Sequence, residues 1–101
     1  MEIRQTKSGN QATLTLVGRF DFNVHRDFKE AYMSLLNEAE VQTLSINLSG
    51  VEYLDSSALG MLLMLRERVQ ATNKQIVLTN PNETVMKILD IANFKKLFTI
   101  A

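Results

Sequence analysis

The stretch of the sequence richest in possible chemistry is an acid followed by two hydroxyls, Asp55-Ser56-Ser57. If a strand ends before it and a helix begins at it, both serines lie where free backbone N–H groups and the positive end of the helix converge. One interpretation is structural, with Asp55 or a serine capping the helix. The other is that one serine is phosphorylated, which adds about −1.5 to −2 charge and changes what can dock there.

The segment after the serines is unusually apolar. Residues 58–65 are apolar at every position except Gly60, which is more than one buried helix face needs. At helical spacing, the side predicted to face the sheet holds Leu59, Leu62, Leu63 and Val69. The opposite side is predicted to hold Met61, Met64, Leu65 and Arg68. Because Met adapts to varied partners, this side is a candidate binding surface, with a second core layer and a homodimer contact as alternatives.

Catalytic and ligand-binding patterns are scarce. The chain has no Cys and one His, so thiolate chemistry is excluded and a His-built metal site is improbable. Ser57, His25 and either Asp21 or Asp55 resemble a hydrolase triad only in composition, because no Gly-x-Ser-x-Gly elbow is present. No phosphate-binding glycine pattern occurs either. We therefore expect no catalysis, metal or cofactor, and interpret His25 as a solvated residue of the first helix turn.

Length and charge limit the remaining classes. A chain of 101 residues predicts one domain, residues 1–101. Its 11 basic and 11 acidic side chains cancel, which argues against a nucleic-acid binder. The N-terminus lacks the pattern of a signal peptide, and the apolar run 58–65 is far shorter than the roughly 18 residues of a membrane span. We expect a soluble, cytoplasmic protein without a membrane span.

The hydrophobic periodicity predicts an opening β-hairpin, with strands at 3–7 and 12–17 around a turn at Gly9-Asn10, the second strand ending at Gly18. An apolar stripe over 24–39 predicts a first helix, capped by Asp21 or Asn23. Alternation over 43–49 predicts a strand that Gly50 ends.

The second half of the chain continues the alternation of helices and strands. A helix is predicted from Asp55 to about Thr72, and a buried strand at 75–79. A third helix capped by Asn82 follows, and the tail 93–100 is expected to hold a helical turn and an edge strand. The order β-β-α-β-α-β-α-β predicts an α/β fold, a mixed sheet with helices packed on it.

Three segments carry a resemblance: Leu16-Val17-Gly18-Arg19-Phe20-Asp21, Leu44-Ser45-Ile46-Asn47-Leu48 and Asp55-Ser56-Ser57-Ala58-Leu59-Gly60. Through them the sequence resembles the STAS-domain proteins, specifically the free-standing anti-sigma-factor antagonists of bacteria. The similarity runs along almost the whole chain, and the Asp-Ser-Ser loop followed by Leu-Gly is its most specific part. The family usually has Gly after the second serine, where this sequence has Ala58, which favours helix but removes some backbone freedom.

The resemblance implies roles for individual residues. The second serine of the loop is the family's phosphoacceptor, which corresponds to Ser57, with Ser56 and Asp55 beside it. Asp21 matches an acidic residue of the first loop that lies near the phosphorylation site. Phe20 and Phe22 flank Asp21; one of the two can be core, and an exposed Phe there would serve docking. The implied partner surface consists of Phe20, Met61, Met64, Leu65 and Arg68.

The implied function is a phosphorylation-controlled switch. Unphosphorylated, such a protein binds an anti-sigma factor, often a serine kinase, and so frees a sigma factor. Phosphorylation of Ser57 would release the anti-sigma factor, and a serine phosphatase would restore binding. One alternative is a STAS subunit docking on a transporter ATPase or a larger signalling assembly. Another is a module that binds a small ligand or nucleotide.

Overall fold

The computed structural model describes all residues, 1–101. Its elements are β1 (Glu2–Ser8), β2 (Gln11–Phe20), the 3-10 turn η1 (Phe22–Val24), α1 (His25–Leu36), β3 (Thr43–Leu54), α2 (Ser56–Ala71), β4 (Gln75–Thr79), α3 (Glu83–Ile91), the 3-10 turn η2 (Phe94–Lys96) and β5 (Thr99–Ile100). The strands form one sheet in the order β1-β2-β3-β4-β5. Only β1 is antiparallel to its neighbour; the other pairs are parallel. The predicted mixed α/β fold is confirmed.

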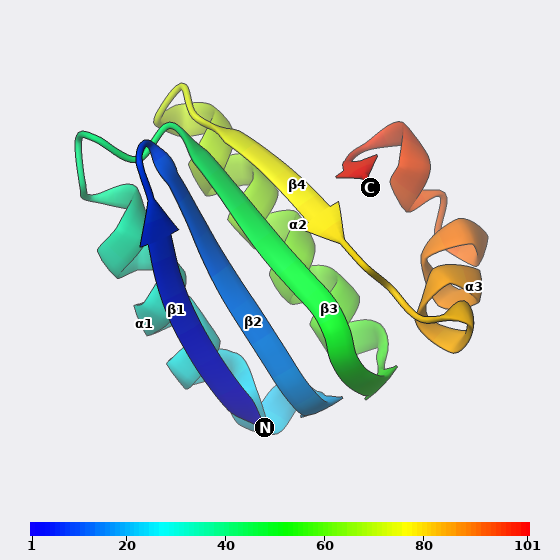
Figure 1. The fold of residues 1–101 in the computed structure, drawn as a ribbon. Helices are drawn as coiled ribbons and strands as arrows, with labels where there is room; N and C mark the ends of the chain where they lie inside the picture. Colours follow the sequence, from blue (N-terminus) through cyan, green and yellow to red (C-terminus); the bar gives the residue numbers. More distant parts are fainter.

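One face of the sheet carries the core. In register, Leu14 of β2 lies beside Ile46 of β3, which lies beside Leu78 of β4, and all three are fully buried. Helices α1 and α2 cover this face, behind the sheet in the view of Figure 1, while α3 lies to its side. The two covering helices contribute the buried Phe28 and Leu62. The apolar alternation of the strands therefore meets the apolar stripes of two helices.

Strands β2 and β3 continue past Gly18 and Gly50, the glycines at which the sequence predicts that they end. Gly18 has a φ of 113°, which an L side chain rarely adopts, and β2 continues through it to Phe20. A Cβ on Gly50 would lie 2.9 Å from the carbonyl oxygen of Leu16, so only glycine fits there. The register between the strands shifts beside both glycines. These β-bulges break the alternation, and the predicted strand ends at Gly18 and Gly50 are wrong for that reason.

The hairpin turn, the third helix and the tail are confirmed in position. The hairpin turns at Gly9 and Asn10, and α3 begins at Asn82, whose side chain accepts a 2.8 Å hydrogen bond from the backbone N–H of Val85. The tail forms the expected helical turn and edge strand. The strand at 75–79 is right in position but wrong in burial: only Leu78 is fully buried, because β5 pairs with just two residues of β4.

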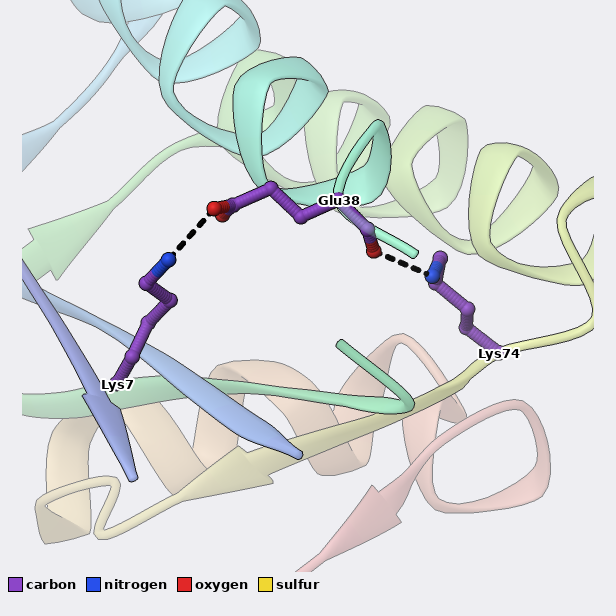
Figure 2. Close-up of polar contacts among 3 residues, drawn as sticks. All are labelled: Lys7, Glu38 and Lys74. Carbon is purple, nitrogen blue, oxygen red and sulfur yellow. Dashed lines mark hydrogen bonds and ion pairs between the residues drawn. The ribbon is translucent and has the colours of Figure 1, made fainter. Parts of the chain in front are cut away.

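The first helix ends at Leu36, three residues before its apolar stripe ends. A polar clamp holds the chain that follows (Figure 2). The Nζ of Lys74 donates to the carbonyl oxygen of Glu38 at 3.0 Å and to that of Val41. Lys7 of β1 pairs with the Glu38 carboxylate, and this hydrogen bond raises the pKa of Lys7. The clamp therefore joins β1, the segment after α1 and the start of β4 at one end of the sheet.

Candidate functional site

The end of the sheet away from the clamp brings together the two acidic loops. Strands β2 and β3 run parallel and end side by side, at the lower end of the sheet in Figure 1. Phe20 pairs with Leu54 there, and the N–H of Asp55 donates to the carbonyl oxygen of Phe20 at 3.3 Å. In parallel sheets, ligands commonly bind just beyond the carboxyl ends of the strands. Residues 21–25 and 55–57 therefore lie at a favourable edge.

Asp55 begins α2. Its backbone is extended, and its Oδ1 accepts a hydrogen bond of 2.9 Å from the N–H of Ala58. The backbone N–H groups of Ser56 and Ser57 donate to no group of the protein. Of the caps that the sequence allows, Asp55 or a serine, the structure has Asp55, which leaves two free donors at the positive end of the helix.

Asp21 has the same role in the neighbouring loop. Its Oδ1 accepts a 3.0 Å hydrogen bond from the N–H of Asn23 and so caps the 3-10 turn η1. Its other oxygen lies 3.9 Å from Nε of Arg19, and the Arg19 guanidinium lies over the ring of Tyr53 at 5.1 Å. The prediction that Asp21 or Asn23 caps the first helix is wrong, because α1 has Val24 at its N-cap, without a side-chain hydrogen bond, and Asp21 caps the turn that precedes it. In this place Asp21 positions the aromatic residue that follows it.

A shallow groove of about 450 Å³ opens between these loops. It is lined by Phe22, His25, Ser57, Gly60, Met61 and Met64. The Ser57 side chain is half-buried in this groove, and its hydroxyl makes no hydrogen bond within the protein. Ser56 is exposed and lies outside the groove. The two serines, adjacent in sequence, therefore have different surroundings.

The groove has an aromatic wall. Phe22 leaves 68% of its surface exposed, and its ring stacks on the imidazole of His25 with centroids 5.7 Å apart. His25 is the first residue of α1, so its predicted place in the first helix turn is right, but its ring is half-buried against Phe22 rather than fully solvated. The signal that was missed is the spacing of three between Phe22 and His25, which brings both rings to one side of the turn.

Gly60 leaves the backbone of α2 exposed in the groove. A Cβ added there would meet no atom within 4 Å. Glycine inside a helix costs about 0.5–1 kcal/mol relative to alanine. No contact within the protein requires this glycine, so its use keeps the backbone of α2 accessible beside Ser57 and Met64.

Three comparisons with known proteins agree with this arrangement. Residues 3–99 match the family model described as "Mlab, STAS domain". The chain belongs to the STAS-domain family. A "STAS-domain containing protein PA14_20770" of Pseudomonas aeruginosa is 44% identical over 93 residues, which covers 92% of this chain and 90% of that one.

Relatives described as antagonists are more distant. The "Anti-sigma F factor antagonist" of Lysinibacillus sphaericus is 24% identical over 79 residues, 78% of this chain and 68% of the relative. The antagonist SpoIIAA in its unphosphorylated form superposes with a TM-score of 0.82 at 19% identity, covering 99% of this chain and 88% of that one. The phosphorylated form of Bacillus SpoIIAA gives a TM-score of 0.75 at 18% identity, covering 99% and 91%. At these identities the structures show a shared STAS fold.

Within this STAS domain, the first aromatic of the Asp21 loop faces inward. Phe20 is fully buried, and its ring packs edge-on against Phe28 of α1 at 5.0 Å. The expected exposure of Phe20 is wrong because β2 runs two residues beyond Gly18 and carries Phe20 into the core. Phe22 is the exposed aromatic of the pair.

The predicted facing of α2 is also wrong for three residues. Met61 and Leu65 retain 4% and 0% exposure, whereas Leu63, expected to face the sheet, is exposed. Met64 is 46% exposed and lines the groove as a surface residue should. The buried residues of α2 are Ala58, Met61, Leu62, Leu65 and Val69. Helix α2 packs on the sheet and beside α1 (Figure 1). Its buried face is therefore wide and includes Met61 and Leu65.

Arg68 is exposed on α2 but does not line the groove. It acts on Tyr32 of α1 instead. Burial raises the pKa of the Tyr32 hydroxyl, and the positive charge of Arg68 offsets part of that rise. The charge of Arg68 therefore acts toward α1, and the groove itself has no arginine or lysine.

The structure groups no three His, Asp or Glu side chains in a way that could hold a metal ion. None of its helices has both the length and the apolar character needed to cross a membrane. What the site offers is therefore a free hydroxyl, two free backbone donors and exposed apolar side chains.

Proposed function

We propose that this STAS-domain protein is an anti-sigma-factor antagonist, a binding module without catalytic activity of its own. The observation that carries the proposal is the groove that Ser57, with its unengaged hydroxyl, lines together with the exposed Phe22 and Met64. Exposed aromatic and Met side chains around a shallow hollow are typical of protein-binding surfaces. The antagonist names of the Lysinibacillus relative and of SpoIIAA support the same assignment.

The partner in this proposal is an anti-sigma factor that is itself a serine kinase. It binds the groove while Ser57 is unmodified, and a sigma factor is thereby freed. Its kinase activity then phosphorylates Ser57, and a serine phosphatase reverses the modification. The existence of a phosphorylated form of SpoIIAA supports a switch of this kind. The three proteins would meet in the cytoplasm.

Phosphorylation would switch binding off locally. A phosphate adds about −1.5 to −2 charge, and a partner covering the groove would have to remove water from it. The Asp55 carboxylate, two residues away, adds repulsion for any acidic group of the partner. The fold itself need not change, because Ser57 is half-buried and its hydroxyl has no hydrogen bond to lose.

Mapping the phosphorylation site tests the choice of serine. The chain, Ser57→Ala and Ser56→Ala are each incubated with the cognate kinase and ATP, and phosphopeptides are sequenced. We expect Ser56→Ala to be labelled and Ser57→Ala to remain unlabelled. Label that persists in Ser57→Ala and disappears in Ser56→Ala would refute the assignment.

A capture experiment tests the partner. Wild type, Ser57→Ala and Ser57→Asp are used as baits, and the bound proteins are identified by mass spectrometry. We expect the first two to retain the anti-sigma factor and Ser57→Asp to retain less, with partial loss because Asp carries less charge than phosphate. Recovery of a transporter ATPase in place of a kinase would replace the proposed partner. Equal retention by both variants would remove charge as the switch.

A further inference from the structure

The groove contains one side chain able to carry a positive charge. Ser57 is the residue proposed to be phosphorylated. Of the other five lining residues only His25 has an ionisable side chain, the rest being Phe22, Gly60, Met61 and Met64. The imidazole is held by stacking on Phe22 at an interplanar angle of 19°. No hydrogen bond or ion pair within the protein engages either ring nitrogen. His25 is thus an oriented donor without a partner, in the same groove as the Ser57 hydroxyl.

We infer that His25 is the residue that binds the phosphate of phosphorylated Ser57. This inference rests on the proposed function, since it concerns the modified form of that site. A ring N–H of His25 would donate to a phosphate oxygen, together with the free backbone N–H groups of Ser56 and Ser57. The phosphate would then lie along the groove, over the surface that the unmodified protein offers to its partner.

The other cations near these loops are already engaged or lie elsewhere. Arg19 is paired with Asp21 and lies over Tyr53. Arg26, next to His25, has Glu30 as its ion-pair partner on the exposed side of α1. The capping carboxylate of Asp55, close to the phosphate in sequence, opposes its charge. A phosphate at Ser57 therefore has His25 as its available counter-charge.

Two other surface features are weaker candidates for a ligand site. The second hollow, bounded by Arg66, Lys74 and Thr99, has both of its cations bound to backbone carbonyls, Arg66 to Leu97 and Lys74 to Glu38 and Val41. The exposed Ile91 on α3 has no polar group beside it that would select a ligand. His25 combines a fixed ring orientation with ring nitrogens that have no partner, and it lines the same groove as the Ser57 hydroxyl.

A double-mutant cycle with phosphoserine incorporated during translation tests the contact without any kinase. Denaturant unfolding is measured for every protein of the cycle in one buffer at about pH 6. The cycle uses wild type and His25→Gln, each with serine or phosphoserine at position 57. The change in folding equilibrium constant on adding phosphate should be about two- to fivefold more favourable with His25 present. His25→Ala should show at least the same loss.

Arg26→Gln is the matched control, because it removes a full charge one residue away and outside the groove. Equal coupling of the phosphate to Arg26 and to His25 would mean that the phosphate responds only to the overall positive charge nearby. That result would overturn the inference. So would the absence of coupling at His25. Either result leaves the proposed function standing, whereas failure of the kinase to label Ser57 would overturn that function and leave the measured contact in place.

Discussion

The two ends of the sheet differ in how they use their polar groups. At the end where β3 and β4 begin, Lys74 donates to the carbonyl oxygens of Glu38 and Val41, and Lys7 pairs with Glu38 (Figure 2). At the end where β2 and β3 finish, the Ser57 hydroxyl and two backbone N–H groups have no partner in the protein. The polar groups at the first end hold segments of the fold together. Those at the second end remain free to bind another molecule.

The groove also leaves apolar side chains without a partner in the protein. Phe22 and Met64 remain exposed at the groove, beside a helical glycine that the fold does not require. A chain gains stability by burying such groups and by replacing such a glycine. The groove therefore holds features that the isolated protein does not need for stability, which is the expected mark of a binding site.

The largest expected effect separates core from groove on one helix. Leu65→Ala removes a fully buried side chain and should lower the free energy of unfolding by about 2–5 kcal/mol. Met64→Ala, its neighbour on the exposed side, should stay within about 0.5 kcal/mol of wild type. Urea unfolding of both variants gives the comparison. Equal losses would mean that Met64 belongs to the core and that the groove is not a surface.

The clamp at the opposite end should matter for stability alone. Lys74→Met keeps the apolar part of the side chain but leaves the carbonyls of Glu38 and Val41 without their donor. We expect a loss of about 1–3 kcal/mol in the free energy of unfolding with unchanged partner affinity. The control is Lys96→Met, at an exposed lysine, which should change neither quantity. Weakened partner binding by folded Lys74→Met would contradict the division between the two ends.

The exposed apolar residues of the groove should matter for binding alone. Phe22→Ala and Met64→Ala should each weaken binding of the anti-sigma factor by about tenfold, because each loses roughly 1.4 kcal/mol of apolar contact. Ile91→Ala is the control, since Ile91 is 84% exposed on α3. Calorimetric titration measures all three. A loss confined to Ile91→Ala would move the docking surface to α3.

Gly60 gives the smallest but most discriminating effect. Gly60→Ala should stabilise the free protein by about 0.5–1 kcal/mol, because the added Cβ meets open space. The same methyl group should weaken partner binding severalfold by filling the groove. Thermal unfolding and titration on one preparation give both numbers. A variant that gains stability and binds as well as wild type would show that the partner does not approach this backbone.

Much of the fold could be predicted because its signals are local. The Gly9-Asn10 turn, the caps at Asp55 and Asn82, and the strand 75–79 each depend on a few neighbouring residues. The bulges at Gly18 and Gly50 could not be predicted, because they arise from contacts between strands more than 30 residues apart. The positions of Phe20 and of the end of β3 follow from those bulges.

The candidate site was predicted in its polar part and misjudged in its apolar part. Ser57 and Asp55 stand at a strand–helix junction that the sequence marks clearly. An uninterrupted apolar run has no periodicity, so it cannot show which side of α2 is buried. Val69, isolated among polar residues, could have set the phase: counting back by 4, 7, 8 and 11 from it reaches the other four buried positions of the helix.

The most direct test of the central claim is the affinity of the anti-sigma factor for three homogeneous forms: unmodified, phosphorylated at Ser57, and phosphorylated at Ser56. Both phosphates add the same charge, but only Ser57 lines the groove. We predict that phosphate at Ser57 weakens binding by at least about tenfold, and that phosphate at Ser56 has a clearly smaller effect. Equal affinity of the unmodified form and the form phosphorylated at Ser57 would contradict the account.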